Sequence, residues 1–238
     1  MWLAVDTATD RASVALGTGV ADAVEEDMEG SRRHAAALLP MVSRLLARRG
    51  VTLDAVSGLA LADGPGSFTG LRVGAAMMKA LARTRGLPLF AAPSLLVRAA
   101  GVATEGALVL AVADALRGEV YAGLYRFHPG RVETLLSAGV RRPGELVSAA
   151  PVPDVLVGDA PGPIVQGLEA WAGRRMLRPP AGAPQARWLI GLTQMAGGAA
   201  PVVAVEGWQP EYGRPAEAQT RWETVHGRPL PDPVGNPR

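Results

Sequence analysis

The stretch LAVDTATDRASVAL, residues 3–16, consists of two short apolar runs separated by a polar turn. The first run ends at Asp6 and the second begins at residue 12, a pattern typical of a β-hairpin. A similar string, LAVAD, ends at Asp114, 108 positions after Asp6, and it too is followed by a turn and an apolar run over residues 119–126. The matched context favours an internal duplication, with one copy in each half of the chain.

The periodicity of apolar residues predicts the remaining elements. In the first half we expect strands over residues 20–26, 56–62 and 87–91, and helices over residues 32–49, 71–85 and from residue 94. Ser31 is the expected N-cap of the first helix, and Pro40 is expected to kink it or delay its start. In the second half, helices are expected near residues 143–149, 161–171 and 185–197.

Strand-strand-strand-helix-strand-helix, repeated twice, is the layout of the actin-like ATPase (ribonuclease H-like) fold. We therefore predict an α/β protein with one actin-like lobe over residues 1–104 and a smaller lobe over residues 105–226. Residues 227–238 are rich in proline and are expected to form a disordered tail.

Composition excludes several kinds of chemistry. The 238 residues include no cysteine and only three histidines, so a thiol nucleophile, a disulfide, a thiolate metal site and a helical histidine pair for zinc are excluded. The formal net charge is +2, and 48% of the residues are hydrophobic, which suits a globular chain. The amino-terminal residues lack a signal-peptide pattern and no apolar run is long enough to span a membrane, so we expect a cytoplasmic protein without a membrane partner.

A nucleotide site in this fold needs backbone amides that can reach the phosphates, and glycine permits that approach. The first hairpin, residues 6–13, contains no glycine; the second contains only Gly118, beside the bulkier Leu116 and Arg117. We therefore expect Asp6 and Asp114 to close their own turns, with metal binding as the alternative.

The segment DGPGSFTGLRVG, residues 63–74, is a glycine-rich loop before a helix, but it matches neither phosphate-loop pattern. We interpret it as a structural loop in which Gly64, Pro65 and Gly66 form a tight turn and Thr69 caps the helix. Ser67 lacks the nucleophile-elbow pattern, and a catalytic pairing of Ser67 with His34 is the less favoured alternative.

Gly70 and Gly74, with neighbouring alanines, predict a low helix surface that a second helix could approach closely. Either this chain or another must cover such a surface in water. Met77, Met78 and Leu81 would add adaptable apolar contacts.

The strings LAVDTATDRASVAL, ADGPGSFTGLRVG, DALRGEVYAGLY and PEYGR, in this order and with His34 between the first two, resemble the bacterial TsaB (YeaZ) family. The resemblance implies two actin-like lobes and a role in threonylcarbamoyl modification of the tRNA adenosine beside the anticodon, in tRNAs that read codons beginning with A. It implies a non-catalytic subunit that pairs with the paralogous transferase TsaD. The TsaE ATPase joins that complex, and tRNA is reached through it.

The resemblance also implies that this chain alone binds no cofactor, because ATP and a metal ion belong to the partner subunits. The transferase's histidine pair is not retained here, since Leu38 stands four residues after His34. Two further positions depart from the family pattern: Leu116 replaces an arginine and Gly213 a leucine. The alternative that we weigh against an accessory subunit is an actin-like kinase or ATPase that acts on its own.

In the family, the first two helices carry the partner interface, and a homodimer is expected when the partner is absent. Carried over to this chain, the implied interface residues are His34, Leu38, Met41, Leu45, Gly70, Gly74, Met77, Met78 and Leu81.

Overall fold

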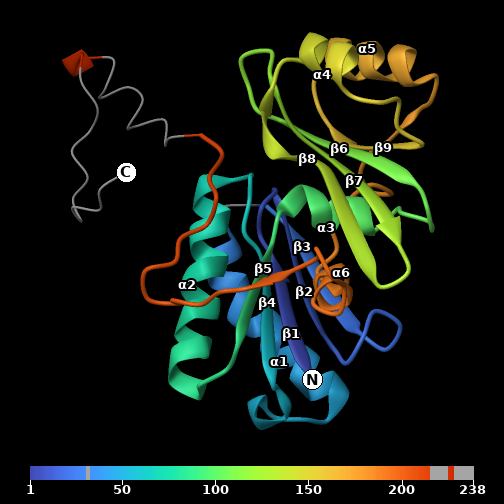
Figure 1. Cartoon of the computed structure of the whole chain (residues 1–238). Helices are drawn as coiled ribbons and strands as arrows, with labels where there is room; N and C mark the ends of the chain where they lie inside the picture. Colours follow the sequence, from blue (N-terminus) through green and yellow to red (C-terminus); the bar gives the residue numbers. More distant parts are fainter. Residues whose placement is uncertain (31–32, 215–224, 228–238) are drawn as a thin grey trace.

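The computed structural model describes residues 1–30, 33–214 and 225–227, and it contains two β-sheets that form two lobes (Figure 1). The first sheet has the strand order β11-β5-β4-β1-β2-β3, and the second has the order β10-β9-β6-β7-β8. Strands of the first sheet are β1 (Trp2–Asp6), β2 (Arg11–Gly17), β3 (Val24–Glu29), β4 (Gly58–Ala62), β5 (Leu89–Ala92) and β11 (Ala200–Pro201). Those of the second are β6 (Leu108–Asp114), β7 (Val120–His128), β8 (Arg131–Arg141), β9 (Val155–Asp159) and β10 (Met176–Leu177).

The two sheets repeat one topology. In the first, β1 pairs antiparallel with β2, β2 pairs antiparallel with β3, and β1, β4 and β5 are parallel. In the second, β6, β7 and β8 form the antiparallel part, and β6, β9 and β10 are parallel. The predicted duplication and the two-lobed α/β fold are thus confirmed, and each copy extends the predicted repeat by a final strand and helix, β5 and α3 in the first and β10 and α6 in the second.

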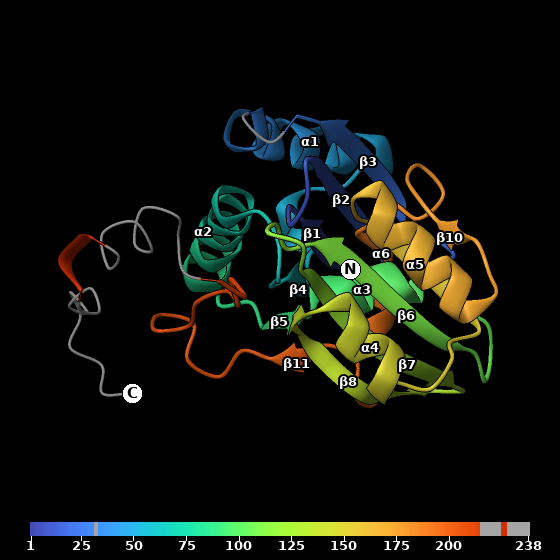
Figure 2. The ribbon, with the colours of Figure 1, turned by 90° about the horizontal axis from the view of Figure 1, so that it is seen from above.

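Three helices follow in each copy. The first copy contains α1 (His34–Arg49), α2 (Phe68–Arg85) and α3 (Ser94–Ala100); the second contains α4 (Pro143–Ala149), α5 (Gly162–Ala172) and α6 (Arg187–Leu192). A short 3-10 turn, Leu53–Ala55, precedes β4. Helices α1 and α2 cover the outer face of the first sheet, and α5, with α4 beside it, covers that of the second (Figure 2).

The last helix of each copy packs against the sheet of the other copy. Helix α3 contacts β6, β7 and β9, whereas α6 contacts β1, β2 and β4, and the two helices touch between the lobes (Figure 1). The first sheet presents small side chains here, including Ala4, Ala15 and Ala60, while Leu3 and Val5 face α1 and α2. These alanines allow α6 to approach the sheet closely, which buries an apolar core between the lobes.

This exchange departs from the predicted division into residues 1–104 and 105–226. Residues 187–192 of α6 lie on the first sheet, and β11 extends that sheet by pairing antiparallel with β5. The physical reason is that the inner face of each sheet needs an apolar cover, and the sequence order of a helix does not determine which sheet it covers.

Several boundaries differ from those predicted. Helix α1 runs continuously through Pro40. The predicted N-cap Ser31 and residues 228–238 of the expected tail lie outside the described residues. Helix α2 begins at Phe68, and its N-cap is Ser67, whose Oγ accepts from the Gly70 N–H at 3.2 Å, rather than Thr69. Strands β8 and β9 were not anticipated. In the part of the chain that the structure describes, no helix is long and apolar enough to cross a bilayer.

Candidate functional site

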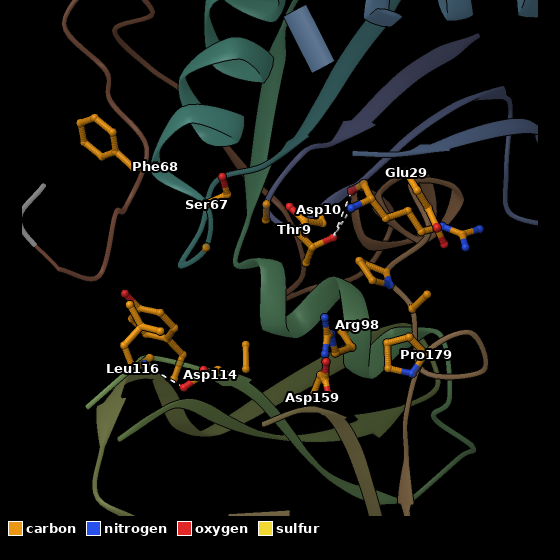
Figure 3. Close-up of a pocket in the computed structure, with 18 of the residues that line it drawn as sticks. Thr9, Asp10, Glu29, Ser67, Phe68, Arg98, Asp114, Leu116, Asp159 and Pro179 are labelled. Carbon is orange, nitrogen blue, oxygen red and sulfur yellow. Dashed lines mark hydrogen bonds between the residues drawn. The ribbon is translucent and has the colours of Figure 1, made fainter. Parts of the chain in front are cut away.

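A cleft of about 1470 Å³ lies between the lobes. It is bounded by the β1–β2 hairpin, the β6–β7 hairpin, the loop before α2 and one side of α3 (Figure 3). In Figure 3, Thr9, Asp10 and Ser67 approach from the first lobe, and Asp114 and Leu116 from the second. The duplicated hairpins therefore face each other across the cleft.

Asp6 and Asp114 occupy equivalent positions at the ends of β1 and β6. Asp6 Oδ1 accepts from the Ala8 N–H at 2.9 Å, and Asp114 Oδ1 accepts from the Leu116 N–H at 2.8 Å. Both carboxylates thus close a turn two residues onward, as the sequence predicts. Burial raises the pKa of Asp6 to about 6, although the Ala8 N–H and the Arg98 charge lower it.

Two backbone amides of the first hairpin are occupied by its own side chains. The Ala8 N–H donates to Asp6, and the Arg11 N–H donates to Thr9 Oγ1 at 3.1 Å. In the second hairpin, Leu116 and Arg117 adopt left-handed φ values of 62° and 55°, and Leu116 is 68% exposed. A phosphate would therefore find the Ala8 and Arg11 amides engaged on one side and a projecting leucine on the other.

Arg98 of α3 is the buried cation of the cleft floor. Its Nη1 donates to the Val112 carbonyl at 3.3 Å, and the charges of Asp6 and Asp159 favour its protonated form. Burial nevertheless lowers the pKa of Arg98. Asp159 in turn pairs with Arg178 at 2.7 Å, whereas Asp6 Oδ2 is buried without a hydrogen-bond partner among the described residues. In the described part of the chain, no group of three or more acidic or histidine side chains is placed to hold a metal ion.

The glycine-rich loop packs closely against neighbouring backbone. A β-carbon added at position 66 would lie 2.2 Å from the Ala8 carbonyl oxygen, and one at Gly64, where φ is +116°, would lie 2.0 Å from the Glu211 carbonyl oxygen. The Ser67 N–H donates to the same Ala8 carbonyl at 2.7 Å. Glycine is required where one backbone approaches another this closely.

Ser67 and His34 are not paired as a nucleophile and its base. The Ser67 hydroxyl caps α2, as described above, and His34 Nε2 hydrogen-bonds the Asp10 carbonyl oxygen at 3.1 Å. His34 is fully buried, at the start of α1. The less favoured catalytic alternative therefore has no geometric support.

Most of the residues carried over as partner interface lie in the interior of the first lobe, which corrects that expectation. Leu38, Met41, Leu45 and Met78 pack beneath α1 and α2 against the first sheet, and His34 is buried as well. The glycines also face inward: a β-carbon at Gly70 would lie 2.0 Å from the Thr7 carbonyl oxygen, and Gly74 packs against the Thr7 side chain. The apolar stripe of α1 is therefore covered by the chain's own first sheet rather than by a partner.

Met77 and Leu81 are only half-buried, and they stay predicted interface residues. Met77 belongs to, and Leu81 borders, an outward face that we call the α1/α2 face. Sequence reasoning anticipated its α2 part, with Ala76, Met77 and Ala80, and missed its α1 part. The face is largely apolar and consists of Ala36, Leu39, Pro40, Ser43, Val73, Ala76, Met77 and Ala80. Leu39 is 58% exposed, which is unusual for a leucine at the centre of an amphipathic helix. A second, weaker stripe of small residues is the signal that could have indicated it.

Comparison with known proteins gives consistent matches. The family model described as "TsaD: tRNA N6-adenosine threonylcarbamoyltransferase" matches residues 27–165. The tRNA threonylcarbamoyladenosine biosynthesis protein TsaB of Escherichia coli (strain K12) is 41% identical over 52% of this chain and 54% of its own length. The Bacillus subtilis (strain 168) protein of the same name is 32% identical over 56% of this chain and 58% of its own. The chain thus spans about half the length of these curated relatives.

A solved structure extends the match over the whole fold. YeaZ from Pseudomonas aeruginosa aligns with a TM-score of 0.69 at 31% identity, and the alignment covers 89% of this chain and 98% of that structure. The chain therefore belongs to the TsaB (YeaZ) family.

Proposed function

We propose that this protein is an accessory subunit in the threonylcarbamoyl modification of the tRNA adenosine beside the anticodon. The observation that carries the proposal is the match to relatives named as tRNA threonylcarbamoyladenosine biosynthesis proteins, together with a full-length structural match within the family. In this role the chain acts in the cytoplasm and contacts tRNA through the complex that it joins.

The proposed partner is a TsaD-like transferase that docks on the α1/α2 face. Two observations support this choice. The TsaD family model matches residues 27–165, which include both helices, so the two proteins share this region of the fold. The α1/α2 face is also built of small and apolar side chains, including Ala36, Ala76 and Ala80, which permit close helix packing. Because paralogous chains have similar faces, we also propose a weaker homodimer in the absence of the partner.

The proposed role is non-catalytic. Two amides of the first hairpin, those of Ala8 and Arg11, are engaged by side chains, and the second hairpin projects Leu116, an arrangement poorly suited to a triphosphate. We assign ATP and the metal ion to the partner subunits, a TsaD-like transferase and a TsaE-like ATPase. This chain would contribute by holding the transferase in a competent conformation.

Reconstitution of the modification tests the proposal. Purified transferase, ATPase, threonylcarbamoyl-adenylate-forming enzyme and tRNA would be combined with and without this chain, and modified adenosine would be measured. We expect product only when the chain is present. Unchanged product without it, or magnesium-dependent ATP turnover by the isolated chain, would contradict the accessory role.

A further inference from the structure

Residues 202–214, which we call the strap, return from the second copy of the fold and run along α2 (Figure 1). The strap begins beside β11, where the Val202 N–H donates to the Leu89 carbonyl at 2.8 Å. It ends in the sequence PEYGR, the last motif of the sequence analysis, which the proposed function leaves unused. Tyr212 and Arg214 of this motif line the interlobe cleft.

The strap is fastened to α2 at two points. Lys79, the only lysine of the chain, donates from Nζ to the carbonyls of Glu206 at 2.9 Å and Trp208 at 2.7 Å. One end of α2 carries a cluster in which the Arg72 guanidinium lies 4.2 Å from the centre of the Phe68 ring and 5.8 Å from that of Tyr212. The Phe68 and Tyr212 rings are 4.6 Å apart. Such contacts hold the strap against the first lobe.

The end of the strap also contacts the second lobe. Arg214 forms a charged hydrogen bond with Glu119, which directly precedes β7. Gly213 lies between the lobes, since a β-carbon there would be 2.6 Å from Tyr121 Cε1 of β7 and 2.8 Å from Pro65 Cβ of the first lobe. Its φ of +71° is a second reason for glycine. Gly213, which departs from the family pattern, therefore lies where the backbone of the strap passes closely between the two lobes.

We propose that the strap is a latch that restrains the opening of the interlobe cleft, with Gly213 and Arg214 as its positioning residues. Helices α3 and α6 pack between the lobes, and the segment after α6 bonds the start of β8 at Val132. The strap adds a connection at the edge of the cleft, where it can restrain rotation of one lobe against the other. Because Lys79, Phe68 and Arg72 hold the strap on α2, it also links the opening of the cleft to one of the two helices of the α1/α2 face.

The absence of cysteine makes the lobe opening directly measurable. Arg48→Cys on α1 and Gln166→Cys on α5 place two spin labels on exposed helix positions of different lobes, away from the strap. Double electron–electron resonance then gives the distribution of distances between the labels. In this background we would compare Arg214→Met and Gly213→Leu, with Arg214→Lys as the conservative variant.

Arg175→Met is the matched control, because it also removes an arginine–glutamate pair, with Glu169 at 3.3 Å, but one confined to the second lobe. We expect Arg214→Met and Gly213→Leu to shift the distribution to longer distances and to broaden it, while Arg214→Lys and Arg175→Met retain the parent distribution. Hydrogen exchange of residues 202–212 should rise in the two released variants.

If Gly213→Leu does not fold, the comparison of Arg214→Met with Arg214→Lys decides the question alone. A parent-like distribution in a folded Arg214→Met would overturn the latch. The measurement uses no transferase and no tRNA, so its outcome is independent of the proposed function.

Discussion

Thr7 and Gly74 are in direct contact: a β-carbon at position 74 would lie 2.4 Å from Thr7 Oγ1. The same hydroxyl donates to the Gly70 carbonyl at 2.8 Å, so the chain just after β1 is fixed against α2. Because Thr7 directly follows Asp6, this contact also sets the position of the first hairpin at the cleft. The glycine pair of α2 thus serves the internal packing of the first lobe.

Gly74→Ala should destabilise the fold by about 1–3 kcal/mol, because the added methyl group overpacks the contact with Thr7. Urea-induced unfolding measures the change in free energy. Gly167→Ala is the matched control: it lies inside α5, and nothing lies within 4 Å of the added β-carbon. There alanine should raise stability by up to about 1 kcal/mol. Equal effects at the two positions would show that the Thr7 contact is not restrictive.

Leu39→Arg and Ala76→Arg should each weaken binding of a TsaD-like transferase by at least about tenfold, because each places an unpaired charge on the α1/α2 face. Both positions are exposed, so the fold should be retained. Titration calorimetry with the purified transferase measures the affinity. Ala170→Arg, exposed on α5 of the second lobe, is the control with the same charge change. Wild-type affinity in both variants would place the partner elsewhere.

Stability should fall as the pH rises from about 4 to about 7, in part because of Asp63. Burial, and then the neighbouring Glu211 charge, raise the pKa of Asp63 to about 7 from an ordinary 3.8. Between these values the folded chain retains a proton that the unfolded chain has lost, so raising the pH favours unfolding. Asp6, with a pKa raised to about 6, acts in the same direction.

Asp63→Asn should therefore raise the free energy of unfolding by about 1–3 kcal/mol over the parent at pH 8 and by little at pH 4, because the amide has no charge to bury. Urea unfolding across this pH range provides the comparison. Glu105→Gln, at an exposed position, controls for the loss of one negative charge. A difference that stays constant with pH would contradict the assignment to Asp63.

Glu25 holds α6 against the first sheet. Glu25→Ala should lower the free energy of unfolding, measured by urea denaturation, by about 2–3 kcal/mol. Its carboxylate accepts from the Ser13 hydroxyl at 2.6 Å and pairs with Arg187 of α6, while its side chain is only 8% exposed. The substitution would leave these donors without their partner. Glu133→Ala, which removes an exposed pair with His128, should cost less than about 1 kcal/mol. Similar losses in both variants would argue against the buried network.

The sequence by itself determined the features that depend on neighbouring residues. The alternation and turn chemistry around Asp6 and Asp114 were sufficient to predict two hairpins and their closed turns, because the amide two residues onward is always within reach of an aspartate at a strand end. The Gly-Pro-Gly sequence of residues 64–66 likewise predicted a turn, because that depends on local backbone geometry.

The tertiary structure alone decided what covers each apolar surface. The stripe of Leu38, Met41 and Leu45 has the same periodicity whether it faces a sheet of its own chain or a partner, and only the packed structure shows that it faces inward. The sequence likewise did not indicate that α3 and α6 pack on each other's sheets, or that Gly213 lies between Tyr121 and Pro65. Each joins residues far apart in sequence, and periodicity carries no information about which distant surface a residue will meet.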